Sequence, residues 1–210
     1  MTWRAVPATA GITALTLLVS AMLLLTGSLD TAAFQAGFIP LRWSATVSAD
    51  HAFLVPAWLT PLSSTLVHGG WAHVAFNLIM LVYCGREAER ALGSGAILLL
   101  YGLGAYAAAA GQWALAPTSV MPMIGASGPI SAVVAAYALL YGQRRAQAVG
   151  PFPASLVHVV WLAVAWIGIQ ALIGLAGLGS APIAVGAHVG GFLLGLLLAR
   201  PLLLWRYRSA

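Results

Sequence analysis

The sequence carries very little charge for its length. Only 6% of its 210 residues are Asp, Glu, Lys or Arg, and 61% are hydrophobic. Soluble domains carry about 25% charged residues. With a mean hydropathy of +0.96, this composition excludes a soluble globular domain and predicts a protein embedded in a membrane.

Lysine is absent from the sequence, and cysteine occurs once. The basic residues are therefore all arginines, and they lie at the ends of apolar segments instead of forming a patch, which argues against a nucleic-acid partner. A single cysteine, Cys84, excludes an internal disulfide. Repeats and low-complexity tracts are also missing, so we expect one polytopic transmembrane domain over residues 1–210.

Long apolar segments make up most of the sequence. We expect six membrane-spanning helices, at about residues 8–29, 64–84, 94–113, 128–142, 154–175 and 183–204. The fourth helix is too short to cross a bilayer, because 15 residues extend about 22 Å and the hydrocarbon core is about 30 Å thick. The first helix also has features of a signal peptide, but its length favours a retained span. The aromatic-rich loop 30–61 is expected to lie partly in the membrane.

The arginines orient these six spans. With six spans, every arginine except Arg42 falls on one side of the membrane. Because arginine-rich loops stay in the cytoplasm, we expect both chain ends to be cytoplasmic. The charged run 86–90 closes the second span, and we interpret it as a solvated turn in which Glu89 caps a neighbouring helix.

Polar side chains inside membrane spans are costly, and they are functional candidates for that reason. His73 and Asn77 are four residues apart and share one helical face of the second span. His188 lies about five residues into the sixth span, and Ser127 precedes the short fourth helix. These positions predict that three helices bring the four side chains to one level, roughly 8–10 Å below the outer surface.

A serine beside a neutral imidazole is the smallest unit that activates a nucleophile. Gly191 and Gly195 form a small-residue face that lets a neighbouring helix pack closely below His188. If that neighbour is the fourth helix, Ser127 comes within hydrogen-bond reach of His188. The structural alternatives are that the serine caps its helix and that the histidine packs or relays protons. Donors for a developing oxyanion would be the Asn77 amide and the N–H groups of His73 and Ser127.

Four motifs, in order along the chain, resemble the rhomboid family of intramembrane serine proteases between about Leu59 and Arg200. They are His68-x4-His73-x3-Asn77, Gly85-x3-Glu89-x3-Gly93, Gly125-Ala-Ser127-Gly128 and Ala187-His188-x2-Gly191-x3-Gly195. Two features depart from the family pattern. Ser131 stands where the family usually has an aromatic residue, and Arg42-Trp43 reverses a common Trp-Arg pair.

The resemblance implies an all-α bundle of six transmembrane helices with the short fourth helix at its centre. It implies Ser127 as nucleophile, His188 as general base, and an oxyanion hole made by His73, Asn77 and the Ser127 N–H. We expect the remaining motif residues to serve structure and packing: His68, Gly125, Gly128, Gly191 and Gly195. The resemblance also implies a water-filled cavity that opens to the outer face, beneath the fifth span and the 177–182 loop.

The implied substrates are transmembrane helices of other proteins, cut near their outer ends. We expect no cofactor and no metal ion, and the sequence makes no prediction of oligomeric state. An Ala-, Leu- and Arg-rich composition without lysine suggests a GC-rich bacterial genome, so a bacterial inner membrane is the expected location.

Three alternatives remain open. One is a rhomboid-like protein that binds transmembrane helices without cutting them, whose expected signature is loss of the serine or the histidine. A second is a small transporter or channel that uses the polar residues as a path, although the paired repeats of many transporters are absent. The third is a rhombosortase-like protease that trims C-terminal anchors.

Overall fold

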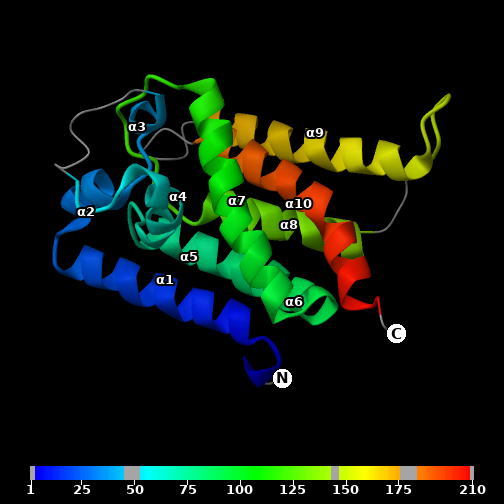
Figure 1. The fold of residues 1–210 in the computed structure, drawn as a ribbon, viewed down its shortest axis with the longest axis horizontal. Helices are drawn as coiled ribbons and strands as arrows, with labels where there is room; N and C mark the ends of the chain where they lie inside the picture. Colours follow the sequence, from blue (N-terminus) through cyan, green and yellow to red (C-terminus); the bar gives the residue numbers. More distant parts are fainter. Residues whose placement is uncertain (1–2, 45–52, 143–146, 176–183, 209–210) are drawn as a thin grey trace.

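The computed structural model describes residues 3–44, 53–142, 147–175 and 184–208. In these ranges every regular element is a helix, and the only β-pairing is two isolated bridges. The helices form a bundle around α8 (Ser127–Tyr141), in which every residue from Gly128 to Ala136 is buried (Figure 1). The expected all-helical class is therefore confirmed.

Long helices make up the body of the bundle. Besides α8 they are α1 (Pro7–Leu25), α5 (Trp71–Met80), α7 (Ser94–Leu115), α9 (Ala154–Leu175) and α10 (Val185–Arg206). The shorter elements are η1 (Trp3–Ala5), α2 (Leu29–Ala36), α3 (Leu41–Ser44), η3 (Ala57–Leu59), α4 (Thr60–Ser63), η4 (Ser64–Leu66), the π-turn η5 (Leu81–Gly85) and α6 (Arg86–Leu92). Figure 1 shows α2, α3 and α4 at one end of the bundle, and α6 with both ends of the chain at the other.

Three of the described helices are long and apolar enough to cross a membrane: Pro7–Leu25, Ser94–Leu115 and Val185–Arg206. A fourth span results if two helices joined by a 92° bend, Ala57–Leu66 and Trp71–Leu92, are counted together. Two more apolar helices are shorter, α8 and the described stretch Ala154–Trp166. The integral membrane class is thus supported, and the count of six spans stays a prediction.

The second expected helix, 64–84, differs most from the structure. The chain bends sharply before Trp71, where Gly70 adopts a positive φ of 154° that other residues rarely adopt. Helix α5 therefore starts later than expected, and His73 lies in its first turn. The helical path then continues to Leu92, so the charged run 86–90 is helical and Glu89 is buried, where we had expected a solvated turn.

Helix α10 packs against α8 and α7 with almost no side chain between the backbones. A side-chain carbon on Gly191 would collide with the carbonyl oxygen of Gly128, and one on Gly195 would collide with that of Ala132. On its other side, Gly190 meets the backbone of α7 in the same way. Small residues therefore let the three helices approach backbone to backbone.

The segment that precedes α8 is tied to the segment that follows α2. Phe38 and Met123 exchange two backbone hydrogen bonds of 3.0 and 2.7 Å, and the Leu41 N–H donates to the Ser119 carbonyl oxygen at 3.0 Å. Parts of the expected loop 30–61 therefore brace the chain just before Ser127. Its residues 45–52, as well as Arg144, Arg145 and the loop 177–182, lie outside the described residues.

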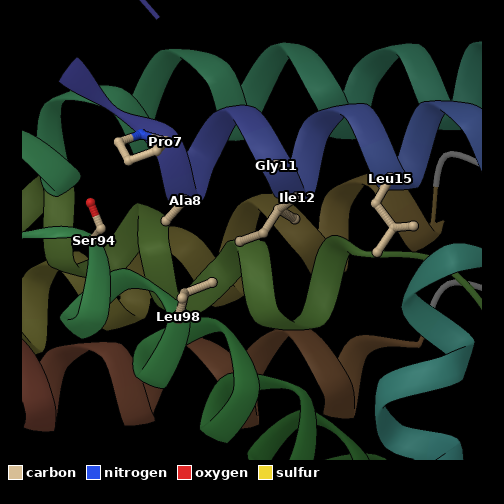
Figure 2. A pocket seen from close by; sticks show the side chains of 7 residues that line it. All are labelled: Pro7, Ala8, Gly11, Ile12, Leu15, Ser94 and Leu98. Carbon is tan, nitrogen blue, oxygen red and sulfur yellow. The ribbon is translucent and has the colours of Figure 1, made fainter. Parts of the chain in front are cut away.

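An outward-facing groove runs between α1 and α7, and Figure 2 shows Ala8 and Ile12 of α1 above Leu98 of α7. Its volume is about 420 Å³, and it is lined by Pro7, Ala8, Gly11, Ile12, Leu15, Ser94 and Leu98. None of these residues belongs to the sites predicted from sequence. Gly11 has open space where a side chain would begin, which makes it a useful control position.

Candidate active site

Ser127 and His188 lie in hydrogen-bond contact at one end of the bundle. Ser127 is the first residue of α8 and half-buried, and His188 is a buried residue in the first turn of α10. The distance between Ser127 Oγ and His188 Nε2 is 2.7 Å. An imidazole nitrogen at this distance is placed to accept the hydroxyl proton, which is what activation of a serine requires.

The contact between the two backbones explains why these side chains meet. Gly191 follows His188 by less than one turn and rests on the carbonyl group of Gly128, the residue after Ser127. The Gly128 position is also closed from α7, because an added side-chain carbon would lie 2.5 Å from the Ala108 Cβ atom. A larger residue at Gly191 would move α10 away from α8 and separate Ser127 from His188, and a larger residue at Gly128 would move α7 away from α8.

The turn before Ser127 requires a glycine for two reasons. Gly125 has a φ of +111°, which residues with side chains rarely adopt. A side-chain carbon there would also lie 2.8 Å from Cε1 and Nε2 of His73. The Gly125 N–H donates to the Ser64 carbonyl oxygen at 2.9 Å, so the turn is fixed from η4 as well.

His68 holds the same turn from the other side. Its side chain is completely buried, and its Nε2 accepts a 3.2 Å hydrogen bond from the Ala126 N–H. Its Nδ1 lies 2.9 Å from Ser20 Oγ of α1. The sequence predicts a structural role for His68, and in the structure its ring bonds the residue just before Ser127.

His73 presents an N–H group to the region of Gly125. The Gly69 N–H donates to His73 Nδ1 at 3.3 Å, so Nδ1 must carry the lone pair and Nε2 the proton. The ring also packs edge-on against His68, with ring centroids 5.0 Å apart. This arrangement leaves the Nε2–H beside the turn that leads into Ser127.

Asn77 lies one helical turn after His73 and is 2% exposed. Its side-chain amide donates a 2.9 Å hydrogen bond to the His73 carbonyl oxygen. A carboxamide group has two N–H bonds, so this contact fixes the orientation of the amide and leaves one donor for another acceptor. Both expected oxyanion donors of α5 are therefore oriented by the backbone near their own helix start.

Ser131 and the surrounding aromatic residues show how this chain departs from the family pattern. The Ser131 hydroxyl is buried and donates to the Ser127 carbonyl oxygen at 2.7 Å. Phe192, one turn after His188, stacks on Trp166 of α9 with ring centroids 5.3 Å apart. The sequence analysis missed this aromatic pair, although the spacing of four residues from His188 would have indicated Phe192.

The fold and the site together define a helical membrane protein that brings a serine and a histidine into contact near the start of its central helix. The family model described as "Rhomboid domain" matches residues 56–205, which is most of the chain. The chain therefore belongs to the rhomboid family.

Similar proteins in bacteria carry the name "Rhomboid protease GlpG". The one from Pectobacterium atrosepticum is 30% identical over 139 residues, which are 65% of this chain and 46% of the relative. The one from Serratia proteamaculans is 31% identical over 140 residues, 66% of this chain and 46% of the relative. The match to one from Yersinia enterocolitica is 29% over 140 residues, with the same coverage. This chain spans less than half the length of these relatives.

Proposed function

We propose that this rhomboid is an intramembrane serine protease that hydrolyses peptide bonds in or near transmembrane segments of other proteins. The observation that carries the proposal is the 2.7 Å contact between Ser127 Oγ and His188 Nε2. The bacterial relatives that are named as rhomboid proteases support it. Ser127 and His188 would act as a catalytic dyad.

The first half of the reaction forms an acyl-enzyme. His188 Nε2 takes the proton of the Ser127 hydroxyl, and Oγ attacks the scissile carbonyl carbon. The resulting oxyanion would be stabilised by the Ser127 N–H, His73 Nε2–H and the Asn77 amide. Because Ser127 is the first residue of α8, its N–H has no partner within the helix and is available for that purpose.

The second half releases the product and restores the serine. The protonated His188 gives its proton to the leaving amine as the peptide C–N bond breaks. It then takes a proton from water, whose oxygen attacks the acyl carbon, and it returns this proton to Ser127 Oγ as the acyl C–O bond breaks. The acidic residues of the described chain lie on α2 and α6, so a carboxylate as the third member of the site is not part of the proposal.

The proposed topology follows from the arrangement of the chain ends. We propose a single domain of six spans with both termini in the cytoplasm of a bacterial cell, and with the site opening to the outer face of the inner membrane. Figure 1 supports this, because both ends of the chain lie at the α6 end of the bundle, away from the start of α8. Substrate helices would be cut near their outer ends.

Labelling with a fluorophosphonate tests the proposed function directly. We expect the detergent-solubilised protein to be labelled, and expect Ser127→Ala and His188→Ala to lose labelling completely while remaining folded. Matched controls are Ser63→Ala, whose hydroxyl donates to the Ala36 carbonyl oxygen, and His158→Gln, a buried histidine on α9. Both controls should label like the wild type.

Two results would contradict the proposal. Labelling that persists in His188→Ala would remove the dyad, and a folded wild-type protein that never labels would remove the protease. In the second case, crosslinking would test whether the protein instead binds transmembrane helices without cutting them. A proton-coupled flux that persists in Ser127→Ala would indicate a transporter.

A further inference from the structure

A series of hydrogen bonds links the C-terminal part of α1 to the residue before the candidate nucleophile. Ser20 Oγ lies 3.0 Å from the Leu66 carbonyl oxygen and 2.9 Å from His68 Nδ1. On the other edge of the ring, His68 Nε2 lies 3.2 Å from the Ala126 backbone nitrogen. Ser20 and His68 are both completely buried, so water does not compete for these contacts.

The positions of the protons in this hydrogen-bond series follow from the two backbone groups at its ends, the Ala126 N–H and the Leu66 carbonyl oxygen. A backbone N–H can only donate, so His68 Nε2 must be the acceptor for Ala126 and carries no proton. The single ring proton is then on Nδ1, which donates to Ser20 Oγ. A carbonyl oxygen can only accept, so the Ser20 hydroxyl donates its own proton to Leu66. Every donor has one acceptor, and only one arrangement of protons satisfies all three bonds.

The alternative states of His68 would each break a bond. If the ring proton moved to Nε2, it would face the Ala126 N–H, and two donors would meet. A doubly protonated ring would meet Ala126 in the same way. The Ser20 hydroxyl favours the productive state, because it accepts the Nδ1 proton in a completely buried place, beside the Leu66 carbonyl group that the ring also faces.

We propose that Ser20 is a positioning residue of this site: through His68 it fixes the Ala126 N–H and thereby the turn that presents Ser127 to His188. The inference rests on the proposed function, because it concerns the geometry of the same serine. Ser20 lies about 100 residues before Ser127 in the sequence and contacts no reacting group. Its effect on Ser127 is therefore transmitted by the imidazole of His68.

The same ring also bears on the second half of the site. His73 packs edge-on against His68, with ring centroids 5.0 Å apart and an interplanar angle of 67°. A tilt of the His68 ring would therefore shift His73, whose Nε2–H is a proposed oxyanion donor. Loss of Ser20 should thus disturb both the nucleophile turn and the oxyanion hole, and should slow the chemical step more than it weakens initial binding.

The test compares three variants of α1. Ser20→Ala removes the hydroxyl that lies 2.9 Å from His68 Nδ1, and Ser20→Thr retains a hydroxyl. Thr16→Val is the matched control, since Thr16 is equally buried one turn earlier on α1 and lies outside the hydrogen-bond series just described. For each variant we would measure thermal unfolding, the maximal rate and half-saturation concentration of fluorophosphonate labelling, and the histidine nitrogen NMR spectrum, assigning His68 by its absence in His68→Gln.

We expect the wild-type spectrum to show His68 neutral with its proton on Nδ1, and expect Ser20→Ala to lose that signature. The maximal labelling rate of Ser20→Ala should fall by roughly tenfold, because a His68 ring without its Ser20 contact holds the Ala126 turn, and so Ser127, less accurately. Its half-saturation concentration should stay near that of the wild type. Ser20→Thr should restore both the spectrum and most of the rate, and Thr16→Val should change neither.

Several outcomes would overturn the inference. One is a wild-type His68 with its proton on Nε2. Another is a Ser20→Ala protein that labels at the wild-type rate, and a third is an equal loss of rate in Thr16→Val. If Ser20→Ala fails to fold, Ser20→Thr decides, since a folded but slow threonine variant with a normal His68 signature contradicts the proposal. A wild type that shows the Nδ1 signature but is never labelled would remove the proposed protease and, with it, the positioning role.

Discussion

Two buried polar clusters hold the opposite ends of this bundle, and they differ in charge. At the end where α8 begins, the cluster is made of neutral serine, histidine and asparagine side chains. At the α6 end it is made around one carboxylate, Glu89, which is 2% exposed. Both clusters attach α1 to the rest of the protein, through Ser20 near one end and through the backbone of its first turn at the other.

Both carboxylate oxygens of Glu89 accept hydrogen bonds. Its two oxygens accept hydrogen bonds from the N–H groups of Ala8 and Thr9 at 2.9 and 2.7 Å, and from the Ser94 hydroxyl at 2.6 Å. The first N–H groups of a helix have no partner within it, and the positive end of the helix dipole favours a negative charge. Glu89 therefore caps α1 from about 80 residues away, and Arg206 adds contacts to the carbonyl groups beside it.

In the Ser127 cluster, the side chains that support the serine have hydrogen-bond partners, but the serine itself is only partly enclosed. His68 uses both ring nitrogens, and the Asn77 amide is held by the His73 carbonyl group, yet Ser127 itself is half-buried and bonds to a single imidazole. A buried polar group whose hydrogen bonds are all made stabilises the fold, whereas one that has further donors and acceptors beside it can react. Variants at the two ends should therefore separate stability from rate.

The largest effect should come from the glycine contact that joins α10 to α8. Gly191→Leu would force a side chain into the Gly128 carbonyl group, and we expect it to cost more than about 3 kcal/mol of unfolding free energy and to abolish fluorophosphonate labelling. Thermal unfolding and labelling in the same detergent would measure both. Gly11→Leu is the control, because open space surrounds that position, and it should be neutral. A stable and labelled Gly191→Leu protein would refute the packing argument.

The next effect should be confined to stability. Glu89→Ala would leave the Ala8 and Thr9 N–H groups without partners, and we expect it to lower the unfolding free energy by about 3–5 kcal/mol, since hydrogen bonds to a charged group contribute about 1.5–3 kcal/mol each. Below its unfolding temperature, the folded fraction should label at the wild-type rate.

Glu87→Ala is the matched control for this variant. Glu87 is partly exposed and pairs with Arg90 on the surface of α6, and such pairs contribute about 0–1 kcal/mol. Equal destabilisation of both variants would show that Glu89 does not act as the cap of α1. A specific loss of labelling in folded Glu89→Ala would show that the two ends of the bundle are coupled.

Much of the architecture could be read from the sequence, for physical reasons that individual residues illustrate. Runs of apolar residues and sparse arginines indicate membrane helices, and the spacing of Gly191 and Gly195 indicates a close helix contact. The sequence predicts a helix from residue 64, because the apolar run begins there. The chain instead bends at Gly69-Gly70, so α5 begins only at Trp71. A hydropathy pattern records which residues avoid water and does not record where the backbone changes direction.

The residues that hold the two ends of the bundle were harder to find than the candidate dyad. The prediction that Glu89 caps a neighbouring helix is confirmed, but its charged run resembles a solvated turn, and its burial depends on a helix start about 80 residues away. Ser20 is one of several small polar residues in the first apolar segment, and only its contact with His68 distinguishes it. Both are connected to their partners through tertiary contacts, and a single sequence carries little trace of those.

The smallest of the three effects should fall mainly on the rate. Asn77→Ala would remove one proposed oxyanion donor, and we expect the rate of labelling to fall by about 10²-fold, as when other enzymes lose such a donor. Because the Asn77 amide makes one neutral hydrogen bond to the His73 carbonyl group, the loss of stability should be only about 1 kcal/mol. Labelling kinetics beside thermal unfolding would separate the two quantities.

The double variant with His73→Ala sharpens this last expectation. If both side chains serve one oxyanion, their effects on the rate should not be additive, because residues that share a partner couple energetically. Additive losses would place them at different steps, and an Asn77→Ala protein that labels at the wild-type rate would remove the amide from the oxyanion hole. Combining Asn77→Ala with Glu89→Ala should give additive losses of unfolding free energy, since the Glu89 carboxylate lies in the cluster at the other end of the bundle.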